Sequence, residues 1–188
     1  MLMYIKKVLL LALIVPAFSL ALAAAGDDGD AFIATLRGLD EVPPVATAGT
    51  GSFTGTLSPD GSTLTYKLTY DNLNAQVLFS HIHFGLPREA TGIMVFLCGP
   101  AAGAMGGPPA GTPNPPPCPG PTSGMVSGSV TAANVLGPDV QGIAPGADFA
   151  KVVQALREGA AYVNVHTNRS KAGEIRGQVR RGDDGGDD

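Results

Sequence analysis

The feature that most constrains the fold is a strict alternation of side chains between residues 63 and 70. Every second residue there is apolar or aromatic, and those between are threonine or lysine: Leu64, Tyr66, Leu68 and Tyr70 form the apolar set. A period of two is the signature of a strand with one buried face. The preceding Ser58-Pro59-Asp60-Gly61 is a turn sequence, so residues 51–57 are expected to form the hairpin partner.

Other short segments have the composition and spacing of strands. They are Ala31–Leu39, Val77–Phe84, Gly92–Leu97, Met125–Val130, Ala161–Thr167 and Glu174–Val179. About eight short strands at this spacing are typical of sandwiches and barrels. The sequence therefore predicts an all-β fold, an antiparallel Greek-key-like β-sandwich, with one short helix.

The helix is expected after Asp148, a residue type that favours the N-cap position. Phe149, Val152, Val153 and Leu156 would share one face, and Gly159 would end the helix. We expect this helix to pack across one end of the sandwich. Residues 98–124 hold most of the proline, so this stretch is expected to be a long Pro/Gly-rich surface loop.

Both ends of the chain differ from the middle. Residues 1–25 combine Lys6 and Lys7, a short apolar run and small residues, the order of a secretory signal peptide without a membrane anchor after cleavage. Without those lysines, ten basic residues face 16 acidic ones, a formal charge of about −6, which disfavours nucleic acid as a partner. We expect acidic tails at 26–30 and 181–188 and one domain at 31–180.

The chain has two cysteines, Cys98 and Cys118. An exported protein meets an oxidising compartment, so a disulfide is the natural interpretation. It would close the Pro/Gly-rich loop and contribute on the order of 3 kcal/mol in the chain-entropy model. A pair of thiolate metal ligands is the alternative, although such cysteines usually lie two to four residues apart.

The chain has only three histidines, and all lie in expected strands. His81 and His83 are two residues apart, so both imidazoles project from one face with Cα atoms about 6.5 Å apart. Tyr162, Asn164 and His166 share a face of another strand. If the two strands are neighbours, three imidazoles converge.

Three imidazoles suit zinc and also copper(II), and the sequence does not choose between them. Glu41 and Glu174 are weaker candidates for a further ligand or for a carboxylate that orients a histidine. The alternative is that the histidines are partly buried groups satisfied by hydrogen bonds to backbone and to Asn164 or Thr167.

Four motifs in order resemble those of the CHRD (chordin-type) domain over Phe32–Val179. The first motif joins FIATLRG from Phe32 with EVPPV from Glu41, and the other three are HIHFG from His81, YVNVHT from Tyr162 and GEIRGQ from Gly173. The resemblance implies an exported β-sandwich module. The growth-factor antagonism of chordin is not implied, because this chain has a single short module.

Three functions follow as hypotheses. The first is a non-enzymatic extracellular, periplasmic or cell-surface module that binds an unidentified extracellular protein or matrix component; no catalytic motif is recognisable. The second is a copper- or zinc-binding protein that uses His81, His83 and His166. The third, a redox enzyme like superoxide dismutase, needs more histidines than the chain has. The oligomeric state stays open, a homo-oligomer included.

Overall fold

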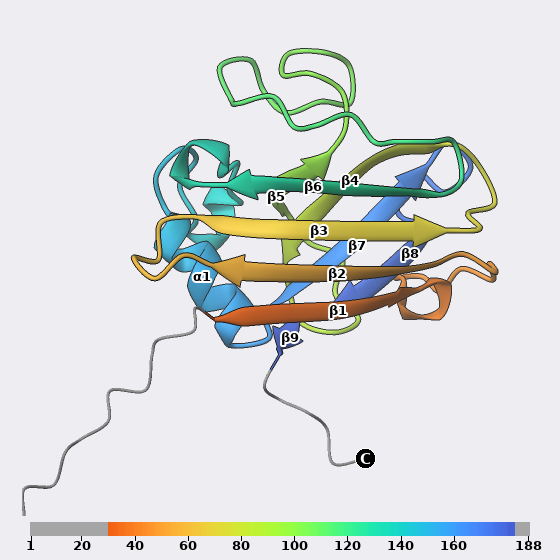
Figure 1. Cartoon of the computed structure of the whole chain (residues 1–188), viewed down its shortest axis with the longest axis horizontal. Coiled ribbons are helices and arrows are strands. Elements are labelled where there is room, and N and C mark those ends of the chain that lie inside the picture. Colours follow the sequence, from red (N-terminus) through yellow and green to blue (C-terminus); the bar gives the residue numbers. More distant parts are fainter. Residues whose placement is uncertain (1–29, 183–188) are drawn as a thin grey trace, which may run out of the picture.

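A computed structural model describes residues 30–182. The expected signal peptide and most of both acidic tails lie outside the described residues. No helix among residues 30–182 is both long and apolar enough to span a membrane. The described chain contains nine strands and one α-helix (Figure 1). The all-β prediction with one short helix is confirmed.

The strands lie close to their expected positions. They are β1 (Ala31–Arg37), β2 (Thr50–Leu57), β3 (Leu64–Asp71), β4 (Val77–Phe84), β5 (Ile93–Cys98), β6 (Gly124–Val130), β7 (Ala161–Thr167), β8 (Ile175–Gln178) and β9 (Arg180–Arg181). Two differences stand out. The first strand ends at Arg37, where Gly38–Asp40 form a 3-10 turn, and β9 is an extra two-residue strand that pairs with β1.

The two layers of the sandwich belong to one curled sheet. Its strand order is β5-β4-β7-β8-β1-β2-β3-β6. In Figure 1, β1, β2, β3 and β6 form one layer, and β4, β5, β7 and β8 cross behind it. The layers join where β1 meets β8, through the single pair of Arg37 and Arg176. The two end strands, β5 and β6, are not paired with each other, so the curled sheet is nearly but not fully closed.

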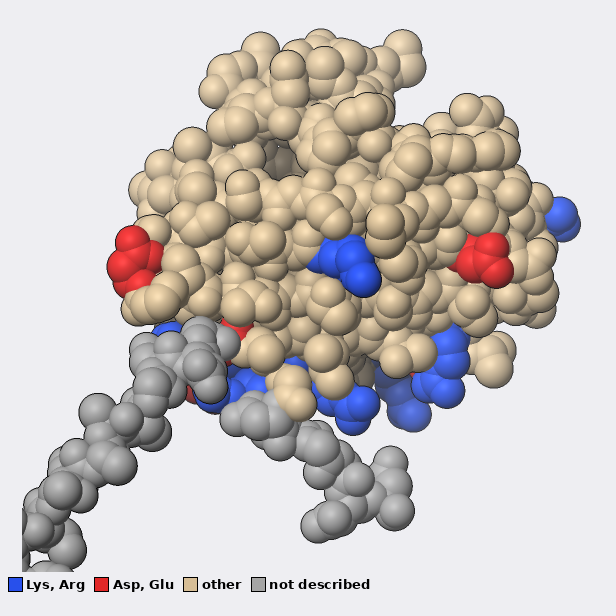
Figure 2. All heavy atoms as spheres, in the orientation of Figure 1, with Lys and Arg blue, Asp and Glu red and all other residues tan. Residues whose placement is uncertain are grey.

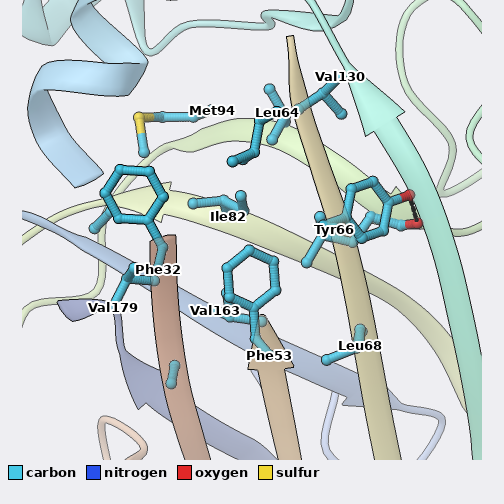
Figure 3. Packing of buried hydrophobic residues seen from close by; sticks show 14 of the residues in the cluster. Phe32, Phe53, Leu64, Tyr66, Leu68, Ile82, Met94, Val130, Val163 and Val179 are labelled. Atoms are coloured by element: carbon cyan, nitrogen blue, oxygen red, sulfur yellow. Dashed lines mark hydrogen bonds between the residues drawn. The ribbon is translucent and has the colours of Figure 1, made fainter. Parts of the chain in front are cut away.

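The core lies between the layers and consists of the alternate side chains that the sequence pattern identified. Leu64, Tyr66 and Leu68 from β3 face Ile82 from β4 and Val163 from β7 (Figure 3). Each of these five side chains is at most 3% exposed. The hydroxyl of Tyr66 donates to the carbonyl oxygen of Leu97 at 2.6 Å, which satisfies its polar atom inside the core.

Helix α1 (Phe149–Arg157) closes one end of the sandwich, as expected (Figure 1). All four predicted face residues are buried, and Gly159 follows with a φ of 65°. Asp148 occupies the N-cap position, but its side chain does not cap the helix. Its carboxylate instead accepts from the backbone N–H of Ala144 and from Lys151.

The segment between β5 and β6 has no helix or strand. Cys98 and Cys118 form a disulfide across it. The loop does not simply project into solvent, because a Cβ added at Gly99 or Gly106 would lie 3.1 or 3.4 Å from the Phe79 side chain. The disulfide-closed loop therefore covers part of the outer face of β4.

Candidate metal centre

The three histidines converge because β4 and β7 are antiparallel neighbours. In the register of this pair, His83 lies opposite Tyr162, His81 opposite Asn164, and Phe79 opposite His166. The side chains of these residues occupy the outer face of the layer, while Ile82 and Val163 point into the core. The condition that the sequence left open is met, since both histidine strands are adjacent.

The imidazole nitrogens are close enough to share an ion. One potential ligand nitrogen from each ring lies within 4.8 Å of the others. Nδ1 of His81 and Nε2 of His166 are 3.2 Å apart. Nitrogens bound to one ion at about 2.0–2.1 Å lie roughly 3.3 Å apart in tetrahedral geometry. His81 and His166 already have this separation, and His83 would have to approach by up to about 1.5 Å.

Backbone carbonyls orient two of the rings. Nδ1 of His83 donates to the carbonyl oxygen of Thr91 at 2.9 Å, and Nδ1 of His166 donates to that of Lys171 at 2.9 Å. In each neutral ring the proton on Nδ1 leaves Nε2 with its lone pair. This arrangement, in which a histidine donates its other N–H to a backbone carbonyl, is common among metal-bound histidines.

Three aromatic side chains enclose the imidazoles. Phe79 lies 5.0 Å from His81 and 4.8 Å from His166 between ring centroids, and Phe96 lies 4.2 Å from His81. Tyr162 stacks on His83 at 4.7 Å with an interplanar angle of 5°. The three histidines are only 2–6% exposed. The imidazoles are therefore buried in largely apolar surroundings.

Burial keeps the imidazoles neutral. It lowers the pKa of His83 and of His166 to about 4, against the raising effect of their backbone hydrogen bonds. Burial also places the pKa of His81 well below its usual value, and the two neighbouring imidazoles add to this shift. Since metal ions bind the unprotonated nitrogen, all three imidazoles are in the form that can bind a metal at neutral pH.

Hydrogen bonds satisfy the histidines only in part. The backbone bonds described above hold two rings, and Nε2 of His166, which bears the lone pair, can accept from Nδ1 of His81 at 3.2 Å. Oδ1 of Asn164 lies 2.9 Å from the same nitrogen but cannot accept from it. Within residues 30–182, however, the Nε2 atoms of His81 and of His83 are buried without a hydrogen-bond partner. The hydroxyl of Thr167 donates to Glu174 at 2.8 Å and not to an imidazole. Two orphaned buried nitrogens need a further explanation.

Glu174 lies outside the histidine group. Its fully buried carboxylate accepts from the hydroxyls of Thr47 and Thr167 and from the backbone N–H of Asn74, at 2.6–2.8 Å. These donors belong to three separate loops or strand ends. Through these hydrogen bonds Glu174 links the β7–β8 connection to the segment before β2 and to the segment between β3 and β4.

Glu41 is also outside the group and is 5% exposed. Burial raises its pKa to about 7, although Arg176 and the backbone N–H of Val42 oppose the shift. Its Oε1 has no hydrogen-bond partner among the described residues. The carboxyl lies against Gly173, where an added Cβ would be 2.2 Å from Oε1.

Sequence reasoning did not identify Phe79 and Phe96, which flank the imidazoles, or Arg176, which lies behind Tyr162. Phe79 was detectable, because it precedes His81 by two residues on the same strand face. Phe96 and Arg176 were not, because their places depend on the pairing of β5 and β8 with β4 and β7. The guanidinium carbon of Arg176 lies 3.4 Å from the centroid of the Tyr162 ring.

Comparison with known proteins bears on the whole chain. The family model of the CHRD domain matches residues 32–179, which is most of the chain. No curated protein and no solved structure shows significant similarity to it.

Proposed function

The chain belongs to the CHRD domain family, and we propose that it is an exported, non-enzymatic protein that binds one copper or zinc ion through His81, His83 and His166. One observation carries the proposal: a potential ligand nitrogen of each of three buried imidazoles lies within 4.8 Å of the others. CHRD domains are typically extracellular and are not a known family of enzymes. The disulfide is in keeping with export.

The hydrogen bonds favour one ligand atom on each ring. His83 and His166 use Nδ1 for backbone carbonyls, so each would bind through Nε2. His81 would bind through Nδ1, which faces Nε2 of His166, and would carry its proton on Nε2. An ion there takes up the lone pair of His83 Nε2 that otherwise lacks a partner.

Metal titration of the purified protein tests this function. Calorimetry should give one equivalent of copper or zinc per chain, together with a rise in melting temperature. His83→Gln should lower the affinity by at least about tenfold, the scale on which even residues that only orient a ligand act. Thr167→Val, which breaks a hydrogen bond outside the group, is the matched control. No binding by Cu(I), Cu(II) or Zn(II) would refute the proposal.

A second candidate function, binding of an acidic matrix polysaccharide, is favoured by an arginine-lined groove. The groove lies beside the β1–β8 junction between the 39–44 and 87–88 segments, and Arg37, Arg88, Arg176 and Arg180 line it. In Figure 2, Lys and Arg side chains gather along the lower edge, beside β1 and β9. This clustering is notable because the whole chain carries more acidic than basic residues.

The free guanidinium groups favour an anion. Within residues 30–182, no hydrogen bond or ion pair holds the side chains of Arg88 and Arg180, whereas Arg37 pairs with Asp40 at 2.9 Å. Guanidinium binds carboxylates bidentately. Because β1 is paired on both sides, the groove offers no free strand edge for a peptide, which favours a uronate polymer.

Affinity for alginate tests this second function. The Arg88→Gln/Arg180→Gln double variant should bind at least tenfold more weakly than the parent, and binding should weaken with salt. The matched control, Lys67→Gln/Lys151→Gln, removes the same charge away from the groove. Equal losses in both variants would mean nonspecific attraction, and binding of poly-glutamate but not of alginate would assign the groove to acidic peptides.

A further inference from the structure

We infer that the three-histidine site selects a soft monovalent ion, Cu(I), over Zn(II) and Cu(II). This inference rests on the proposed metal binding and concerns which ion the site prefers. It comes from the charge and the enclosure of the pocket, because imidazole by itself suits copper and zinc alike.

The ligand set supplies no negative charge. All three ligands are neutral imidazoles, and within residues 30–182 no carboxylate or thiolate joins the group. The electrostatic penalty of moving an ion from water into a low-dielectric site grows with the square of its charge, so a divalent ion meets about four times the penalty of a monovalent one. Neutral ligands in a buried site therefore penalise Zn(II) and Cu(II) far more than Cu(I).

A fixed cation lies behind one ligand. Arg176 stacks on Tyr162, and Tyr162 in turn stacks on His83. The guanidinium donates to the carbonyl oxygens of Glu89 and Leu86 at 2.6 and 3.1 Å, so it is held in place. Its repulsion of a bound ion scales with that ion's charge and acts twice as strongly on a divalent ion.

The enclosure limits the number of ligands. Zinc in proteins is almost always four-coordinate, with water completing a three-residue site. Here the rings of Phe79, Phe96 and Tyr162 surround the imidazoles, and the histidines are at most 6% exposed. Three buried nitrogens match an ion that accepts three ligands, as Cu(I) does, and Oδ1 of Asn164, 2.9 Å from Nε2 of His166, would offer zinc only an uncharged fourth ligand.

Anaerobic competition titrations test the selectivity. Cu(I) and Zn(II) affinities are measured against chromophoric chelators, with Ag(I) as a monovalent ion that does not change oxidation state. We expect Cu(I) to bind at least about 100-fold more tightly than Cu(II), which raises the potential of the bound couple by about 120 mV over the free couple at 59 mV per tenfold. Zinc should bind more weakly than either monovalent ion.

A pair of variants at Phe96 isolates the charge. Phe96 contacts His81 and is only partly buried, so both Phe96→Glu and its neutral counterpart Phe96→Gln fit there. The Glu variant should gain at least tenfold in affinity for Zn(II) over the Gln variant, while Ag(I) affinity changes less. Equal zinc affinities of the two variants would overturn the charge argument.

The outcomes separate the two proposals. If Zn(II) or Cu(II) binds the parent protein as tightly as Cu(I), the selectivity is refuted and the metal site stands. If none of the ions binds with one-to-one stoichiometry, both are refuted. Melting temperatures of the metal-free variants show whether each one is folded, so a loss of binding is read only from folded protein.

Discussion

Glu41 provides the sharpest thermodynamic test of the structure. Its carboxyl is buried, its Oε1 lacks a partner among the described residues, and burial raises its pKa to about 7 from an ordinary value of 4.5. The carboxyl is therefore neutral in the folded protein at pH values where it is already ionised in the unfolded chain. The contribution of Glu41 is most favourable below pH 4.5 and is lost as the pH rises through 7.

The loss follows from the shift in pKa. The rise of the Glu41 pKa from 4.5 to about 7, at 1.36 kcal/mol per pKa unit, corresponds to about 3 kcal/mol of unfolding free energy. Glu41→Gln keeps the shape of the side chain but does not titrate. The free energy of unfolding of the Gln variant, relative to the parent, should therefore rise by about 3 kcal/mol between pH 4.5 and pH 8. Other titrating groups contribute equally to both proteins and cancel.

Urea unfolding followed by circular dichroism at pH 4.5, 6 and 8 measures this difference, provided that the m-values agree. Asp40→Asn is the matched control. It removes a neighbouring carboxylate from an exposed ion pair with Arg37, so its effect should stay below about 1 kcal/mol. A difference between Glu41→Gln and the parent that does not change with pH would refute the buried, destabilised carboxylate.

Three further predictions concern the described residues. In the metal-free protein the NMR titration of His83 should show a midpoint near pH 4, so the stability it contributes is complete above pH 6.5 and falls toward pH 4; a midpoint near 6.5 would contradict its burial. Cys98→Ala/Cys118→Ala should lower the free energy of unfolding by about 3 kcal/mol and expose the loop to proteases, whereas unchanged stability would show that the loop does not need the disulfide. Gly173 has a φ of 130°, and an added Cβ there would clash with the carboxyl of Glu41, whereas Gly61 has a φ of 69° and open space around it. Gly173→Ala should therefore destabilise the fold by more than Gly61→Ala, for which about 1 kcal/mol is expected. Equal losses of unfolding free energy in urea would exclude the clash.

Local patterns were sufficient to predict helix α1 and strands β1 to β8. The alternation in β3 and the turn before it depend on neighbouring residues, and both are present as expected. The two-residue strand β9 escaped prediction because it has no pattern of its own and exists through pairing with Phe32 and Ile33. The side chain of Asp148 was misjudged for a similar reason, since Ala144 and Lys151 compete for its carboxylate.

The sequence predicted the three-histidine site only on the condition that the two histidine-bearing strands are neighbours. The spacing of His81 and His83 placed two imidazoles on one face, but no local pattern says that the strand of His166 lies beside them, about 80 residues further along the chain. The two glutamates illustrate the limit. Each lies in a distinctive short motif, yet Glu174 is surrounded by hydroxyl and amide donors and Glu41 by a glycine and an arginine, all set by tertiary packing.

The burial of β7 adds a physical reason to look for a ligand at this site. Its sequence alternates as if one face met water, but all seven of its residues are buried. Tyr162, Asn164 and His166 therefore carry polar atoms into a closed face, and a buried polar group is unfavourable unless it is paired. The hydroxyl of Tyr162 accepts from the backbone N–H of Thr91, and the amide of Asn164 lies 2.9 Å from Nε2 of His166. The unpaired atoms are the Nε2 atoms of His81 and His83, and a metal ion coordinated by His83 Nε2 would satisfy one of them.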